Sequence, residues 1–120
     1  MNKKLYSLPK KEIIKSKKDF EKIIRTGKKF ASGHIKAFFQ LGDKRRVGFA
    51  VSNKIKGAVR RNKIKRWLRE IYRREKYTLN DSTEIIILVD YFTKDENFHT
   101  LKEEVLQIFK EINENFNKSA

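Results

Sequence analysis

The residues with the clearest chemical character are the basic ones between positions 54 and 76. This stretch holds eleven Lys or Arg and two acids. On a helix, at about 100° per residue, its apolar side chains fall on one stripe: Ile64, Trp67, Leu68, Ile71 and Tyr72. The opposite side then carries Asn62, Lys65, Arg66, Arg69 and Arg73. Solvated helices normally mix both signs of charge, so this cationic face indicates that the helix binds a polyanion.

The charge of the whole chain is also uneven. The net charge is +15, yet residues 1–76 carry 26 basic and 6 acidic groups while residues 77–120 carry 4 and 9. Nucleic acid is therefore the leading candidate partner, with an anionic membrane surface second. The absence of cysteine excludes disulfides and thiolate chemistry, and no apolar run approaches the roughly 20 residues that span a bilayer. We expect a cytoplasmic protein with no membrane partner.

No group of residues in the sequence has the pattern of a protein-borne active site. There is no Gly-rich phosphate loop, no HExxH and no G-x-S-x-G motif. His34 and His99 are isolated in sequence, whereas a general base needs an orienting partner. Asp43, Asp81 and Asp90 fall at expected turns or strand ends, where Asp has a local backbone role. We therefore expect recognition rather than catalysis, and no metal site in the protein.

Capping residues and apolar spacing predict the elements that precede the basic stretch. Residues 1–13 are expected to form a basic N-terminal arm, and Ser16 to cap a helix over 17–25. Gly27 suits a left-handed position at the end of that helix. A strand over 29–41 follows, with a division into two strands as the alternative.

Two neighbouring strands predict a shallow trough beside the basic helix. The turn residues at 42–45 predict a hairpin to a second strand over 46–52. One face of this second strand is nearly bare: Gly48, Ala50 and Ser52. The first strand presents Lys36 and Phe38, and a trough with basic and aromatic groups suits single-stranded nucleic acid. The alternative is that the small residues let the first helix pack closely, with Phe20 and Phe38 in the core.

The remaining elements complete an α+β fold. The basic helix is expected over 58–76, a buried strand over 84–89, and a last helix from Thr100 with a capping box to Glu103. The apolar stripe of this last helix is Leu101, Val105, Ile108, Ile112 and Phe116. Residues 117–120 are expected to be a frayed tail. The order α-β-β-α-β-α predicts a single-domain α/β sandwich over residues 1–120, with a small mixed sheet.

Two runs of residues carry a long spaced pattern. Residues 46–54 read R-V-G-F-A-V-S-N-K, and residues 58–69 read A-V-R-R-N-K-I-K-R-W-L-R. These runs resemble the signature of the bacterial ribonuclease P protein component, R-x-G-x-x-V-S-x-K, a short gap, then A-V-x-R-N-R-x-K-R-x-x-R. With similar first-helix and late-strand residues, the resemblance covers about residues 14–112. Two positions depart from the pattern: Lys63 replaces an Arg, and Asn53 stands where a basic residue is common.

The resemblance implies a subunit of a ribonucleoprotein. In this family a large catalytic RNA holds the catalytic Mg²⁺ ions and removes the 5′ leader of precursor tRNA, and no obligate protein partner is expected. Carried onto this chain, the contacts to the RNA subunit are Arg60, Arg61, Asn62, Lys63, Lys65, Arg66 and Arg69. The cleft for the leader is lined by Phe20, Lys36, Phe38, Ser52 and Lys54. The family also implies a left-handed β-α-β crossover around the basic helix, although about 98% of such connections are right-handed.

Two rival interpretations stay open from the sequence. One is a non-enzymatic RNA-binding protein of ribosomal type with a similar fold. The other is a peripheral protein held on anionic lipid by the basic helix, which is disfavoured because the apolar stripe of that helix already has a core to cover.

Overall fold

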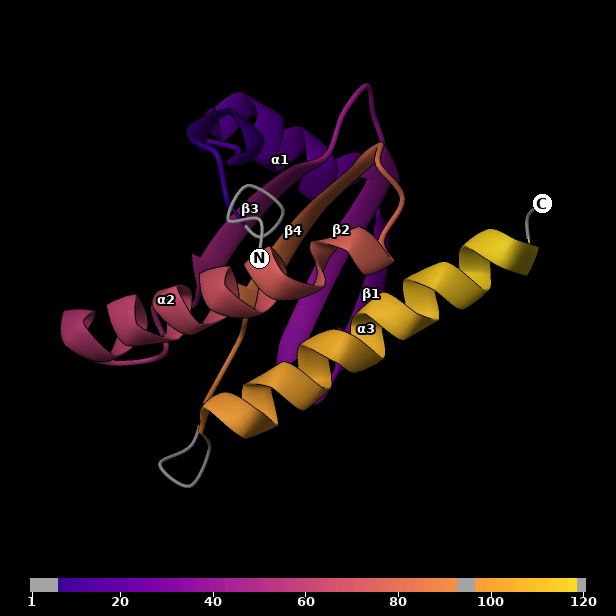
Figure 1. The fold of residues 1–120 in the computed structure, drawn as a ribbon. Coiled ribbons are helices and arrows are strands. Elements are labelled where there is room, and N and C mark those ends of the chain that lie inside the picture. Colours follow the sequence, from indigo (N-terminus) through magenta and orange to yellow (C-terminus); the bar gives the residue numbers. More distant parts are fainter. Residues whose placement is uncertain (1–6, 93–96, 119–120) are drawn as a thin grey trace.

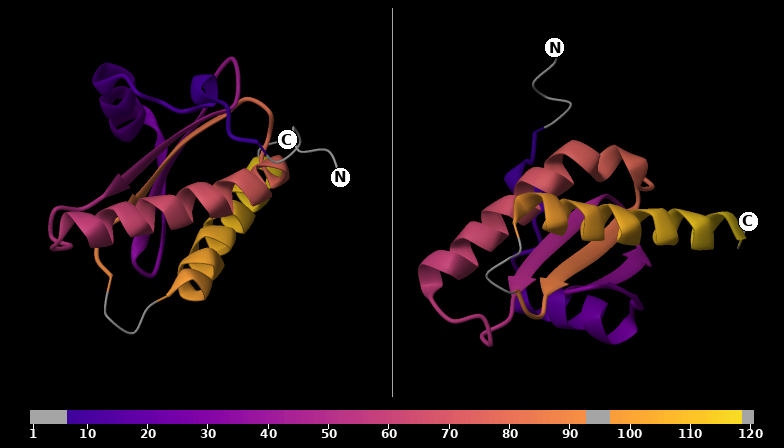
Figure 2. Two further views of the ribbon diagram at one scale, coloured as in Figure 1. Left: turned by 60° about the vertical axis from the view of Figure 1, so that its left-hand side comes forward. Right: turned by 90° about the horizontal axis from the view of Figure 1, so that it is seen from below.

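The chain folds around a four-stranded sheet with helices on both faces. The computed structural model describes residues 7–92 and 97–118, and the strand order is β1-β2-β4-β3. The elements are η1 (Lys10–Glu12), α1 (Lys17–Thr26), β1 (Lys28–Ser32), β2 (Ile35–Leu41), β3 (Arg46–Val51), α2 (Ala58–Glu75), η2 (Lys76–Thr78), β4 (Thr83–Val89) and α3 (Phe98–Lys118). Helices α2 and α3 cover one face and α1 lies on the other (Figures 1 and 2). The predicted α+β class and element order are confirmed, with the first strand divided into β1 and β2.

Strand β4 is one of the two inner strands, and it pairs antiparallel with β2 and parallel with β3. Its three consecutive isoleucines are at most 1% exposed, as a strand covered on both faces requires: Ile85, Ile86 and Ile87. The predicted hairpin between the strands at 29–41 and 46–52 is wrong, because β4 lies between β2 and β3. The connecting residues instead pass the start of β4, where the Gly42 amide donates to the Ser82 carbonyl at 2.8 Å. A turn signal does not report whether the strands on either side of it touch.

The unit β3-α2-β4 has the rare hand. Strands β3 and β4 are parallel neighbours, and α2 connects them across the face that is turned to the viewer in Figure 1. Followed from β3 through α2 to β4, the crossover is left-handed, against the strong general preference for the right-handed form. This confirms the hand that the family resemblance implied.

The two ends of α1 are formed by Ser16 and Gly27. The Ser16 Oγ accepts a hydrogen bond from the Asp19 amide at 3.4 Å, which confirms the predicted cap. The prediction of a left-handed Gly27 is wrong, because this residue is extended with φ −75° and ψ 159°. A Cβ at Gly27 would lie 2.5 Å from the Ile23 carbonyl oxygen and 3.1 Å from that of Phe39. Glycine is needed here for close approach of two backbones rather than for its dihedral freedom.

The apolar stripe of α2 is buried between the helix and the sheet, as predicted. Four of its members are at most 1% exposed: Ile64, Leu68, Ile71 and Tyr72. The fifth, Trp67, is half-buried, and its ring packs edge-on against Phe92 and Phe98 with centroids 6.2 and 6.1 Å away. This packing directs the opposite side of α2 to solvent and so positions the basic side chains.

Helix α3 begins at Phe98, two residues before the predicted start. The Asn97 Oδ1 accepts a hydrogen bond from the Thr100 amide at 3.1 Å, so Asn97 takes the capping role that the sequence assigned to Thr100. The predicted stripe is buried at Leu101, Val105, Ile108 and Ile112, and the side chain of Phe116 lies outside the described part. The helix continues to Lys118, into the predicted tail, while residues 119–120 lie outside the described residues.

The segment before α1 joins the edge of the sheet at β3. The Ile14 amide donates to the Val47 carbonyl at 2.7 Å, and Ile13 bridges Val47 in parallel register. Residues 7–13 of the predicted N-terminal arm are thus in place against the fold, while residues 1–6 lie outside the described part.

A buried polar network fastens this segment to the C-terminal end of α2. The Lys76 side chain is 3% exposed; its ammonium donates to Glu12 Oε1 at 2.8 Å and to the Ser7 carbonyl at 2.7 Å. The Tyr72 hydroxyl donates to Glu12 Oε2 at 2.7 Å. Burial, and then the bond to Glu12, raise the pKa of Tyr72, so its phenol stays a donor. Every charge in this network has a partner of the opposite sign or a hydrogen bond.

Candidate nucleic-acid interface

Between Asn62 and Arg69, the outward side of α2 carries cations with no acid among them. Four of the predicted RNA-binding residues line one surface depression: Asn62, Lys65, Arg66 and Arg69. Within the described part of the chain, none of the three cations makes an ion pair. The i,i+4 repulsion between Lys65 and Arg69 costs about 0.2–0.5 kcal/mol, and the attraction of both cations to a bound polyanion would offset it. The depression therefore presents three cations and no carboxylate, an arrangement that suits a phosphate.

The first turn of α2 uses its basic residues differently. The Arg60 guanidinium donates to the Phe92 carbonyl, and that of Arg61 donates to the Ile55 carbonyl at 2.7 Å. Lys63 lies over the indole ring of the single Trp, with its Nζ 4.9 Å from the ring centroid. The sequence left the direction of the two arginines open, and the structure shows them anchoring the helix start to neighbouring backbone. A guanidinium has five N–H donors, so each keeps donors for a further acceptor.

The cationic face ends one turn before the end of α2. Arg73, expected on this face, lies 2.7 Å from Glu70, which also contacts Arg74 at 2.7 Å. The hydrogen bond from Arg73 is the main cause that lowers the pKa of Glu70. The unneutralised part of the face thus lies between Asn62 and Arg69.

Phe20 of α1 and Phe38 of β2 lie between that helix and the opposite face of the sheet, and both are half-buried. They pack against a small cluster of buried residues: Ile14, Ile23 and Ile86. A Cβ added at Gly48 would lie 2.7 Å from Cε2 of Phe20, so the missing side chain makes room for this ring. The alternative that Gly48 lets the first helix pack closely is therefore correct. Both rings also keep part of their surface exposed.

Helix α1 is held at one end of this face by Arg46. Its guanidinium contacts Asp19 of α1 at 3.0 Å and Glu84 of β4 at 3.2 Å. Burial opposes the charge of Arg46, but the two carboxylates outweigh it and raise the pKa of the group. This ion-pair chain fixes α1 over the start of β3 and leaves the far end of the strand uncovered (Figure 1).

The uncovered end of the sheet holds the other predicted leader residues. The register aligns one partly exposed row across three strands: Lys36, Leu88 and Ala50. Beyond it, the Ser52 amide donates to the Val89 carbonyl at 2.9 Å, and the Ser52 Oγ accepts from the Lys54 amide at 3.2 Å. The fold thus gathers Lys36, Ser52 and Lys54 at this end, one row away from Phe38. We name this region, with Phe20 and Phe38, the open sheet face.

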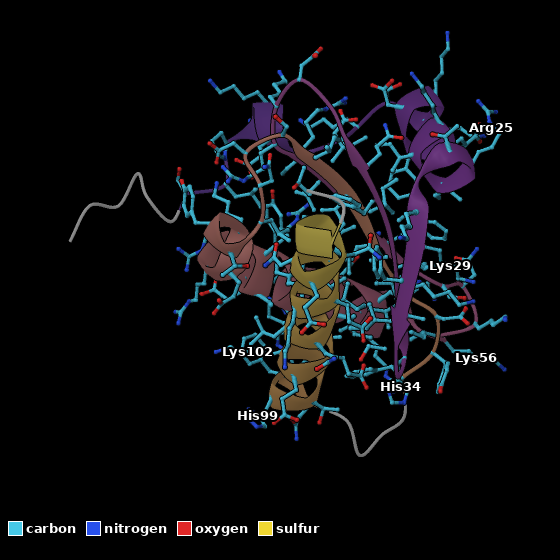
Figure 3. All side chains as sticks on the ribbon, turned by 90° about the vertical axis from the view of Figure 1, so that its right-hand side faces the viewer. Arg25, Lys29, His34, Lys56, His99 and Lys102 are labelled. Carbon is cyan, nitrogen blue, oxygen red and sulfur yellow. The ribbon has the colours of Figure 1, made fainter. Side chains whose placement is uncertain are left out.

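Two charged residues that the sequence did not assign share the open sheet face. Lys29 of β1 is the register partner of Phe38 and points away from α3 (Figure 3). Asp90 was expected to serve local backbone, yet its Oδ2 lies 3.3 Å from the Lys36 Nζ and its Oδ1 lies 4.0 Å from the Lys54 Nζ. Strand alternation signals the face of Asp90, but only the sheet register brings it to both lysines.

The histidines and carboxylates form no metal centre in the described part of the chain. His34 Nδ1 contacts Glu104 Oε1 at 2.7 Å and ties the β1–β2 turn to α3, while His99 Nε2 contacts Glu103 Oε1 at 2.9 Å within α3 (Figure 3). Among the described residues, no three His, Cys, Asp or Glu side chains gather where they could hold an ion. Over those same residues, no helix is both long and apolar enough to cross a membrane.

Known proteins are similar in sequence to this chain over most of its length. A family model described as Ribonuclease P matches residues 8–113. The ribonuclease P protein component of Dictyoglomus turgidum is 37% identical over 110 residues, covering 88% of this chain and 92% of that protein. The chain belongs to the ribonuclease P protein family. The component from Thermotoga maritima is 31% identical over 112 residues, covering 88% of this chain and 96% of the relative.

Solved ribonuclease P proteins also share its fold. The T. maritima protein superimposes with a TM-score of 0.74 at 30% identity, over 83% of this chain and 96% of that one. The Staphylococcus aureus protein gives 0.75 at 28% identity, over 82% and 93%. Both comparisons confirm the family resemblance read from the strand and helix motifs. The chain is thus a protein subunit of the ribonuclease P holoenzyme, the tRNA 5′-processing ribonucleoprotein.

Proposed function

We propose that the outward face of α2 binds the catalytic RNA of ribonuclease P, while the open sheet face binds the 5′ leader of precursor tRNA. The observation that carries this proposal is the depression lined by Asn62, Lys65, Arg66 and Arg69, which holds no acid. The proposed contacts to the RNA subunit are Arg60, Arg61, Asn62, Lys63, Lys65, Arg66 and Arg69. Because α2 buries its other side, RNA bound there leaves the sheet packing undisturbed.

The open sheet face supplies the groups that a single strand needs. The partly exposed rings of Phe20 and Phe38 offer stacking surfaces, and stacking a base on an aromatic ring contributes about 1–3 kcal/mol. Lys36 and Lys54 offer charge for the backbone phosphates, and the Ser52 hydroxyl offers a hydrogen bond. These five residues, from α1, β2 and the end of β3, form the proposed leader site.

In this proposal the chain binds the RNA subunit and the leader, and the RNA subunit performs the cleavage. In the same proposal Mg²⁺ is held by the RNA subunit and the substrate. Among the described residues, no three His, Cys, Asp or Glu side chains gather where they could hold such an ion. We further propose that residues 1–120 act as one domain in the cytoplasm, without an obligate protein partner.

The RNA-subunit contact is tested by removing two charges from α2. The variant R66Q/R69Q should bind ribonuclease P RNA at least tenfold more weakly in filter-binding assays, because it removes two phosphate contacts. The matched control K102Q/K110Q removes two charges from α3 and should bind as the wild type does. Equal losses in both variants would contradict a site on α2.

The division of labour is tested by cleavage assays with and without the RNA subunit. The holoenzyme should cut precursor tRNA, and the purified chain should not; cleavage by the chain alone would contradict the proposal. Sequencing of RNA retained by the chain should recover ribonuclease P RNA. Recovery of ribosomal RNA instead would support the rival ribosomal role.

The leader site is tested by truncating one ring. Phe38→Ala should weaken holoenzyme binding of precursor tRNA about tenfold while leaving mature tRNA unchanged, since only the precursor has a leader to stack. Phe30→Ala serves as the control, because it removes a half-buried ring that packs against the main hydrophobic core instead of the small cluster beside Phe20 and Phe38. A similar loss for mature tRNA would contradict the assignment.

A further inference from the structure

Asp90 places a negative charge at the uncovered end of the open sheet face, within 4.0 Å of two lysines. It directly follows β4, and its amide donates to the His34 carbonyl at 2.9 Å, so its backbone continues the sheet. Strand alternation turns its side chain to the same face as Leu88. The side chain is 27% exposed, which leaves the carboxylate accessible to a bound ligand.

The carboxylate of Asp90 is shared by two lysines from different parts of the chain. Its Oδ2 lies 3.3 Å from the Lys36 Nζ on β2, and its Oδ1 lies 4.0 Å from the Lys54 Nζ after β3. These lysines are the only cations among the five proposed leader residues. Each is therefore directed toward an internal anion in the free protein.

We propose that Asp90 is an internal competitor for the leader phosphate, and that it weakens the protein's hold on precursor tRNA. This inference rests on the proposed leader site. A phosphate that reaches Lys36 and Lys54 must take the position of the carboxylate or lie beside it, so the leader exchanges one ion pair for another. The net charge of the trio is +1 rather than +2, which lowers the attraction for each phosphate.

The exposure of the lysines makes this exchange reversible. The Lys36 and Lys54 side chains are 38% and 78% exposed, and ion pairs at such positions contribute little to stability. The carboxylate can thus be displaced by a phosphate and return when the leader departs. Asp90 then sets how tightly a leader is held without touching the RNA subunit face on α2.

The experiment compares Asp90→Asn with Asp43→Asn in the reconstituted holoenzyme. Asp43 is exposed in the β2–β3 connection at the opposite end of the sheet, so its variant removes the same charge far from the lysines. Dissociation constants are measured for precursor tRNA, made slow to cleave by a 2′-deoxy group at the cleavage site, and for mature tRNA. Affinity for the RNA subunit alone reports whether each variant is folded.

D90N should bind precursor tRNA about three- to tenfold more tightly, the order expected for one surface charge near a phosphate. Mature tRNA should be unaffected, and D43N should match the wild type with both ligands. Adding Lys36→Gln should shrink the gain from D90N, because that lysine is one of the two that the carboxylate occupies.

If the wild-type holoenzyme prefers precursor tRNA but D90N binds it equally or more weakly than the wild type does, this inference is wrong and the proposed leader site still stands. Weaker binding would make Asp90 a group that positions the lysines or holds a cation. An equal gain for mature tRNA would also overturn it, since the effect would then not pass through the leader. A wild-type holoenzyme with no preference for precursor would overturn the proposed leader site itself.

Discussion

Replacing Lys76 by Met should destabilise the protein by about 3–5 kcal/mol. The ammonium is 3% exposed. Among the described residues, its removal leaves the Glu12 carboxylate, 11% exposed, with the Tyr72 hydroxyl as its one side-chain hydrogen-bond partner. It also removes the donor to the Ser7 carbonyl. Breaking a buried ion pair from one side costs about 3–5 kcal/mol, a large share of the roughly 5–15 kcal/mol that stabilises a domain.

The assay is urea unfolding at pH 7, with free energies from linear extrapolation. Lys10→Met removes the same charge from an exposed position in the neighbouring segment and should change stability by less than about 0.5 kcal/mol. The double variant E12Q/K76M should recover part of the loss, because no unpaired carboxylate is left buried. A loss below about 1 kcal/mol for K76M, or strict additivity in the double variant, would refute the reasoning.

Three further outcomes follow from single contacts. Gly48→Ala should lower the free energy of unfolding by about 1–3 kcal/mol in urea titrations, because its Cβ would lie 2.7 Å from the Phe20 ring. Arg69→Gln should raise the thermal midpoint of the free protein slightly while weakening RNA-subunit binding, since it relieves i,i+4 repulsion. The hydrogen bond from Arg73 lowers the pKa of Glu70. The ionised carboxylate of Glu70 therefore stabilises the fold at pH values above its unfolded-state pKa, and this stabilisation is lost as the pH falls through its folded-state pKa. The thermal midpoints of the wild type and Glu70→Gln should then converge in acid.

The parts of the fold that local pattern determines were predictable. The stripe from Ile64 to Tyr72 follows from helical period alone, and the buried run around Ile86 follows from its continuous apolar character. The position of β4 between β2 and β3 was not predictable, because the turn at 42–45 suits a hairpin and a wider connection equally. The hand of the crossover came only from the family resemblance.

The candidate site also has features that the sequence predicts and features that it does not. Spacing on α2 placed Lys65, Arg66 and Arg69 on one face, because their positions depend only on the helix. The buried role of Lys76 depends on Glu12, 64 residues away, and no local pattern reports such a pair. The contacts of Asp90 were not predictable for the same reason, since Lys36 lies on β2 and Lys54 lies in the connection after β3.

The place of β4 in the chain has a consequence for biosynthesis. The strand that closes the sheet is made after α2, so the ribosome releases the whole basic helix before β2 and β3 have the neighbour that joins them. Until residues 83–89 emerge, Leu68 and Ile71 lack the completed sheet on which they are packed. A nascent chain therefore displays the cations of α2 on an unfinished protein until the last third of the polypeptide follows.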